Sequence, residues 1–156
     1  MADSTYLKNV VEPYIVRWLS DRISIPLSSR RVPVGSRIDG ELVHFEFDGV
    51  SADGRVGALV STSHTVKPGG TRKLHVDASN LLQAPFGRRL MVFVSLDVKT
   101  NFVNKCDGLL PLAKIEMHVC TDLPVDMLAR IARFQAVAKS GGGDKGKIWK
   151  PGGKSK

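Results

Sequence analysis

The chain has 156 residues, of which 42% are hydrophobic, and its formal net charge is +8. This length predicts one domain with a core of ordinary size, and the longest apolar run, Leu90 to Val94, is far below the roughly 20 residues of a membrane-spanning helix. Residues 139–156 carry six lysines against Asp144, so most of the positive charge is concentrated in this tail. The tail predicts salt-dependent attraction to any polyanion, DNA or RNA included, and the rest of the chain is only mildly basic.

The two cysteines and the first residues bear on the cellular compartment. Cys106 and Cys120 stand alone, without a CxxC pair or another metal-binding spacing. Residues 1–4 lack the basic start and apolar segment of a signal peptide. We therefore predict a cytoplasmic protein without a membrane partner. Its cysteines are expected to be reduced structural thiols, with a disulfide between them as the alternative.

Apolar residues recur at helical spacing from residue 7 to residue 19 and predict an N-terminal helix, with Ser4 as its N-cap. Pro13 lies inside this pattern. Because proline interrupts the hydrogen bonds of a helix interior, we expect a kink there or a regular helix that starts near Asn9.

Three strands are predicted next. A loop at 26–29 leads to a short strand at 31–36, which Pro33 restricts to a sheet edge or a bulge. The strand at 41–50 alternates, with one side formed by Val43, Phe45 and Phe47 and the other by His44, Glu46 and Asp48. The turn Ala52-Asp53-Gly54 then predicts a hairpin, with residues 55–63 returning antiparallel.

The second half of the chain predicts further elements and a tail without a fold. Residues 65–73 contain Pro68-Gly69-Gly70 and are interpreted as a flexible loop. Asp77 or Ser79 is expected to cap a short helix that ends before Pro85. We also predict strands at 89–96 and 114–120, a helix at 124–139 and a disordered Gly/Lys-rich tail at 140–156.

The element order and one sequence block resemble the PD-(D/E)XK, or restriction-endonuclease-like, nucleases over about residues 6–100. The block contains Phe47-Asp48, Ser51-Ala52-Asp53-Gly54 and Gly57. The resemblance implies an α/β fold whose αβββαβ core is a mixed central sheet flanked by helices, here followed by a further strand and helix. It would form a single domain over residues 1–139.

The same resemblance indicates that the chemistry of this family is lost. The family carries an Asp at the end of one strand and an acid-x-Lys triplet on the next. Asp48 fits the first position, but the triplet falls on Ala58-Leu59-Val60, where neither Ala58 nor Val60 can bind a metal or supply a charge. A register shift of one residue does not restore an acid or an amine. Ordinary nuclease activity is therefore disfavoured, and no cofactor is expected.

An active, displaced site is the alternative. Glu46 lies two residues before Asp48 on the same strand face, and Glu12 resembles a helix acid that some of these nucleases use as an extra metal ligand. Asp48 with Glu46 or Glu12 would bind Mg²⁺, which prefers hard oxygen ligands. His64 and Lys67 follow the strand that lacks the triplet and are weaker substitutes.

Paired basic residues are candidates for phosphate contacts, because such contacts supply affinity without reading the base sequence. They are expected at strand starts or in loops, where they would gather at one sheet edge; a solvated basic surface is the simpler interpretation. The candidates are Arg30, Arg31, Arg72, Lys73, Arg88 and Arg89.

Three hypotheses follow from the sequence. The first is a catalytically degenerate nuclease-like domain that binds nucleic acid or a nucleoprotein partner. The second is an active metal-dependent endonuclease with a displaced site around Asp48. The third is a structural or protein-interaction domain, which would form a homo-oligomer if the face that carries Ala58 and Val60 is exposed and apolar.

Overall fold

The computed structural model describes residues 5–136. The predicted cap at Ser4, the last residues of the predicted C-terminal helix and the predicted tail at 140–156 lie outside the described residues. The chain divides into two compact units, one that ends at Leu123 and one that starts at Pro124. In the second unit residues 125–136 are helical, as expected of the C-terminal helix, and the predicted domain boundary at residue 139 stays a prediction.

The first unit is built from alternating helical and extended segments. In chain order they are η1 (Leu7–Val11), α2 (Glu12–Ile23), β1 (Leu27–Ser36), β2 (Leu42–Ser51), β3 (Val56–Ser61), α3 (Pro68–Gln83), β4 (Arg88–Phe93), α4 (Leu96–Cys106), η2 (Leu112–Lys114) and β5 (Glu116–Val119).

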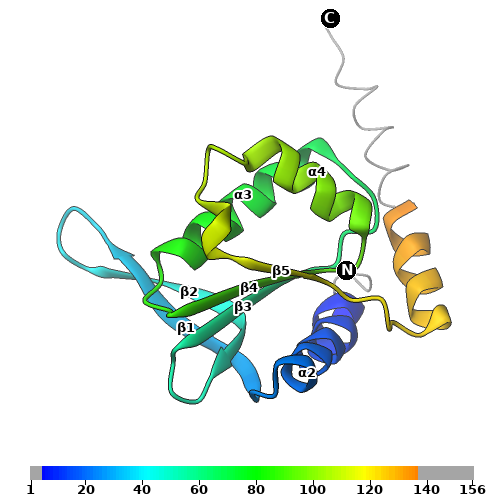
Figure 1. Ribbon diagram of the computed structural model, residues 1–156, viewed down its shortest axis with the longest axis horizontal. Coiled ribbons are helices and arrows are strands. Elements are labelled where there is room, and N and C mark those ends of the chain that lie inside the picture. Colours follow the sequence, from blue (N-terminus) through cyan, green and yellow to red (C-terminus); the bar gives the residue numbers. More distant parts are fainter. Residues whose placement is uncertain (1–4, 137–156) are drawn as a thin grey trace, which may run out of the picture. The chain divides into compact units, whose positions relative to one another are not determined.

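These strands form one mixed sheet in the order β1-β2-β3-β4-β5. The pairs β1/β2 and β2/β3 are antiparallel, whereas β3/β4 and β4/β5 are parallel. Parallel neighbours need a long crossover, and α3 and α4 supply these two connections. Figure 1 shows α2 on one face of the sheet and α3 and α4 on the other. The α/β class with a mixed, helix-flanked sheet is therefore confirmed.

The break expected at Pro13 takes the form of a π-helical turn. In η1 the N–H of Glu12 donates to the carbonyl of Leu7, five residues earlier. Pro13 then occupies the first turn of α2, where the missing N–H costs nothing. The wide turn and the regular helix meet at Glu12, and short π-helical segments of this kind occur frequently at functional sites.

The core on the α3 side is rich in aromatic side chains and depends on a glycine in β3. Phe86 packs edge-to-face on Phe47, with ring centroids 5.0 Å apart. A Cβ on Gly57 would lie only 2.1 Å from the Phe86 ring. Gly57 and Leu59 thus face this core, so Ala58 and Val60 point to the other side of the sheet, where α2 lies.

The predicted loop at 65–73 is wrong, because α3 begins at Pro68. Proline presets the backbone of a first helical turn, and Leu74, Ala78 and Leu81 bury one face of the helix. The predicted caps are wrong for the same reason: Asp77 and Ser79 lie in the middle of α3, and the Ser79 hydroxyl donates to the carbonyl of His75. Only the end of this helix before Pro85 is confirmed.

Two other boundaries differ from prediction. α4 was not predicted, although Val98, Phe102 and Cys106 recur at helical spacing and the Ser95 hydroxyl caps the first turn. β1 begins at Leu27, so residues 27–29 are strand and not loop. The edge or bulge position expected of Pro33 is confirmed, because β1 is an outer strand with a register shift between residues 33 and 35.

The prediction that the two cysteines are reduced thiols is confirmed. Cys106 and Cys120 are buried free thiols and are not joined in a disulfide. Among the described residues, no helix is both long and apolar enough to span a bilayer.

Candidate functional site

Asp48 lies at a bulge in β2. The pairing of β1 with β2 runs through Ser28 opposite Val50 and Arg30 opposite Phe47, so that Ser29 alone lies opposite two residues, Asp48 and Gly49. A β-bulge of this kind bends the strand and redirects a side chain, and bulges are over-represented beside active sites. At Gly49 an added Cβ would meet Val16 of α2 at 3.4 Å, which shows how closely the helix crosses the strand at this bulge.

One oxygen of the Asp48 carboxylate forms a hydrogen bond to the neighbouring strand, and the other does not. Its Oδ2 accepts a hydrogen bond of 2.8 Å from the backbone N–H of Val60 on the neighbouring strand. Burial raises the pKa of Asp48 above its ordinary value, and this hydrogen bond opposes the rise. No described residue donates a hydrogen bond to Oδ1, so that oxygen is available to a ligand.

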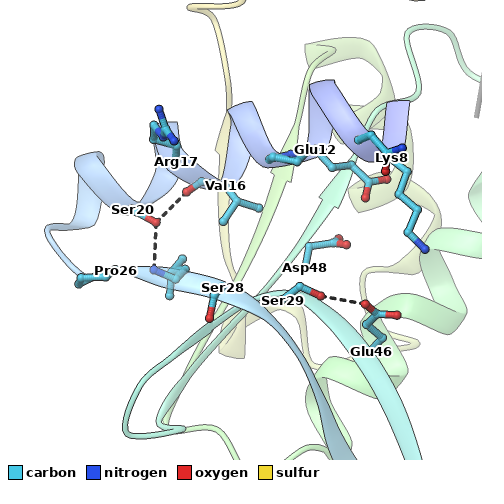
Figure 2. Close-up of a pocket in the computed structure, with 13 residues that line it drawn as sticks. Lys8, Glu12, Val16, Arg17, Ser20, Pro26, Ser28, Ser29, Glu46 and Asp48 are labelled. Atoms are coloured by element: carbon cyan, nitrogen blue, oxygen red, sulfur yellow. Dashed lines mark hydrogen bonds between the residues drawn. The ribbon is translucent and has the colours of Figure 1, made fainter. Parts of the chain in front are cut away.

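Glu12 supplies a second carboxylate from the start of α2. Figure 2 shows its side chain descending from the helix towards Asp48. Burial raises the pKa of Glu12 to about 7, and the nearby Asp48 carboxylate adds to the rise. The two acids therefore lie close enough to repel each other, and a cation between them would relieve that repulsion.

Two lysines from two helices add positive charge near the acids, and Asp77 of α3 adds a further negative charge that raises the pKa of Asp48. Lys73 of α3 and Lys8 of η1 both act to lower the pKa of Glu12, and Lys73 does the same for Asp48. Lys73 also forms an exposed hydrogen bond of 3.4 Å with Asp77, one turn along α3. Neither lysine lies on β3, where the resemblance would place an amine.

A pocket of about 610 Å³ lies between α2 and the paired strands β1 and β2; Glu12, Asp48 and Lys8 line it, and Lys73 lies outside it. The acidic side includes Glu46, whose carboxylate accepts a hydrogen bond of 2.9 Å from the Ser29 hydroxyl. The sequence predicted that Asp48, Glu46 and Glu12 lie near one another, and all three line this pocket. The one pocket thus contains each acid that the sequence offered for metal binding.

Ala58 and Val60, where the resemblance would have placed an acid and a lysine, are buried. Ala58 is 0% exposed and Val60 is 8% exposed. No apolar patch is therefore open to a second copy of the chain at these two residues, and the oligomer hypothesis loses its predicted support. His64 and Lys67 lie between β3 and α3, and neither is among the charges that shift the pKa of Glu12 or Asp48.

Two of the predicted phosphate-binding residues have protein partners. Arg88 makes two hydrogen bonds to the carboxylate of Glu116 on β5, one of them 2.9 Å long. Arg89 donates to the carbonyls of Leu81 and Ala84 and so satisfies the C-terminal end of α3. Both side chains are engaged in holding strands and helix ends together.

The other predicted basic residues lie on β1 and α3. Arg30 donates to the carbonyl of Ser51 beside the hairpin turn, and Arg31 is exposed on the outer strand. Arg72 is exposed on α3. The charge of Lys73 acts to lower the pKa of Glu12 and Asp48, which places it near the candidate site.

The donor set suits a hard divalent cation. Mg²⁺ is commonly bound by one or two carboxylates, with waters and substrate phosphates as the remaining ligands. Asp48 and Glu12 supply two carboxylates, and among the described residues no group of three or more His, Cys, Asp or Glu side chains is placed to hold a metal ion. The residues therefore fit a two-carboxylate site and not a closed, all-protein one.

Comparisons with known proteins found no match to this chain. No protein-family model matches the chain, and neither does any curated protein or solved structure. The function therefore has to be inferred from the pocket itself.

Proposed function

We propose that the protein is a metal-dependent phosphodiesterase of nuclease-like architecture, in which helices supply the second acid and the amine in place of a second strand. One observation carries this proposal: Glu12 and Asp48 lie in one pocket with two lysines nearby. An acid, a second acid and an amine are the groups of a PD-(D/E)XK site. Here they come from β2, α2 and α3 in place of two adjacent strands.

Each residue has a distinct task in this proposal. Asp48 and Glu12 hold a Mg²⁺ or Mn²⁺ ion, and Asp48 keeps its hydrogen bond to Val60, which fixes its orientation. When bound, such an ion activates a water and stabilises charge on phosphoryl oxygens. Lys73 and Lys8 provide positive charge for the phosphate, the role that the family assigns to its strand lysine.

The test is cleavage of labelled DNA and RNA, offered as single strands, duplexes and branched molecules, with Mg²⁺, Mn²⁺ or a chelator. Asp48→Asn and Glu12→Gln remove the charges while they keep the size of the side chains. Asparagine can still accept the Val60 hydrogen bond, so loss of activity will not reflect loss of the fold. We expect each variant to lose about 100-fold or more in rate.

Glu41→Gln is the matched control, because Glu41 is an exposed acid in the turn between β1 and β2 and lies outside the pocket. It should cleave at the wild-type rate. A wild-type protein that leaves every substrate intact in both metals contradicts the proposal, as does a Glu12→Gln variant with full activity.

A second candidate, a non-catalytic nuclease-like domain that binds nucleic acid or a nucleoprotein partner, is favoured by a separate observation. The strand that should carry the acid-x-Lys triplet is buried and apolar, and Arg31 and Arg72 are exposed. This reading expects salt-dependent binding without cleavage, weakened by Arg31→Ala and Arg72→Ala together. If deletion of residues 140–156 abolishes all binding, the folded part has no nucleic-acid role.

A further inference from the structure

The pocket extends well beyond its two acids and changes character along its length. At one end lie Glu12, Asp48 and Glu46. Further along α2 its walls are apolar, formed by Val16 of the helix together with Pro26 and Leu27 at the start of β1. The volume of about 610 Å³ lies within the range of about 300–1,000 Å³ that is typical of small-molecule sites.

A polar side chain borders the same walls. Asn9 in η1 lines the pocket and is exposed to solvent, whereas the Ser28 side chain points away from α2. Ser20 donates to the carbonyl of Val16 and accepts from the N–H of Leu27, which ties α2 to β1 across the far end. Apolar walls with a few polar groups are the usual composition of a site for an organic ligand.

The acids lie beneath α2, and the pocket continues from them along the helix. Glu12 and Asp48 are both half-buried, and Figure 2 shows the helix lying over Asp48. A phosphodiester bound at these carboxylates would place an adjoining nucleoside in the apolar part of the pocket. In a duplex that nucleoside is stacked and paired, and its extrusion costs a few kcal/mol.

We infer that the pocket is a nucleotide subsite, with the phosphate at the acidic end and the base against Val16, Pro26 and Leu27. The substrate class is then unpaired nucleic acid: a single strand, a flap or a frayed end. This inference rests on the proposed function for the position of the phosphate. The apolar walls support it independently of any cleavage.

The experiment compares Ser29→Trp with Ser36→Trp. Both serines are exposed on β1, but Ser29 lines the pocket and its side chain reaches Glu46 there, whereas Ser36 lies at the far end of the strand, outside the pocket. A tryptophan at residue 29 adds bulk on the pocket side of β1 and leaves the Glu12 and Asp48 side chains in place. Melting temperatures of both variants first verify that they fold, and Ser36→Trp accounts for the cost of an added indole on this strand.

Binding of the mononucleotides 2′-deoxyuridine 5′-monophosphate and uridine 5′-monophosphate, with Mg²⁺, is measured by titration calorimetry. Mononucleotides are used because the basic tail attracts long polyanions non-specifically. We expect saturable binding that Ser29→Trp weakens at least tenfold and Ser36→Trp leaves unchanged. The two nucleotides differ only in the sugar and show whether the site discriminates DNA from RNA. Equal binding by wild type and Ser29→Trp, or no binding by the wild type, overturns the inference.

Cleavage of a circular single strand and of a relaxed, covalently closed circular duplex of the same sequence separates the inference from the proposed function. The inference expects the single strand to be cut at least tenfold faster, and equal rates on the two substrates overturn it. Absence of metal-dependent cleavage on both substrates refutes the proposed function. The nucleotide subsite is then judged on mononucleotide binding alone.

Discussion

The neighbouring strands β2 and β3 meet α2 on the same face of the sheet, but they do so with different chemistry. β2 carries a bulge and presents the partly buried acid Asp48, whereas all six residues of β3 are buried. The proposed nuclease-like function would ordinarily divide its chemistry between two such strands. Here β3 contributes packing and the Val60 N–H, so the charges that accompany Asp48 come from Glu46 on β2 and from helices.

The largest expected effect comes from adding a single methyl group to β3. Gly57→Ala places a Cβ against the Phe86 ring, which is itself buried against Phe47 and cannot swing into solvent. We expect the free energy of unfolding to fall by about 2–3 kcal/mol, as for other overpacked cores. Urea denaturation provides the measurement.

The matched change on β2 is Gly49→Ala at the bulge. There the added Cβ meets Leu27 at 3.1 Å and Val16 at 3.4 Å, which are contacts that small shifts relieve. We expect a loss of about 1 kcal/mol or less. If Gly49→Ala costs more than Gly57→Ala, the contrast between a tightly packed β3 and an adaptable β2 is wrong.

The next effect concerns the pH dependence of stability. The pKa of Glu12 rises from 4.5 in the unfolded chain to about 7 in the folded protein. Between these values the folded protein binds more protons, so its free energy of unfolding falls as the pH rises through this window. The full shift corresponds to about 3 kcal/mol, and solvent screening at a partly exposed group reduces this to about 1–2 kcal/mol.

Denaturation of wild type and Glu12→Gln at a series of pH values between 4.5 and 8 tests this dependence. Glutamine cannot ionise, so the variant should gain stability relative to wild type as the pH rises. Burial also raises the pKa of Asp48, and the part of the slope that Asp48 contributes should remain in the variant. Parallel curves for the two proteins would show that Glu12 has an ordinary pKa.

The smallest loss of stability is expected for an ion pair between β4 and β5, two strands that do not line the pocket. Arg88→Ala removes the ion pair with Glu116, which is about two-fifths exposed. Exposed pairs contribute about 0.2–1 kcal/mol, so the loss of stability should be about 0.5 kcal/mol. The salt dependence of nucleic-acid binding should not change; a lower slope would show that Arg88 contacts phosphate after all.

Much of the sheet was predictable because the local preferences of its residues favour the same strands and turns that its packing requires. The alternation of residues 43–48 and the Asp53-Gly54 turn give the β2/β3 hairpin, and Pro33 indicates the outer strand. The N-terminal part of α3 was missed because Gly69-Gly70 favours a loop by local preference. The burial of Leu74, Ala78 and Leu81, which outweighs that preference, depends on the sheet.

The candidate site was predictable in its residues but not in its arrangement. Asp48, Glu46 and Glu12 were identified from strand periodicity and resemblance, and all three line the pocket. Lys8 lies one helical turn before Glu12, which is a local signal that was available. Lys73 was expected in a loop, so its position near the acids could not be inferred. The bulge at Asp48 depends on the pairing of two strands and leaves no mark in the sequence.

Titration calorimetry with Mg²⁺ and Mn²⁺ at pH 8, without nucleic acid, tests the central claim most directly. The claim is that Glu12 and Asp48 together bind one divalent cation. It predicts saturable binding of one ion by wild type and by Glu41→Gln, and affinity at least tenfold weaker in both Glu12→Gln and Asp48→Asn. Wild-type binding that either pocket variant retains in full would contradict the claim, as would no binding by the wild type.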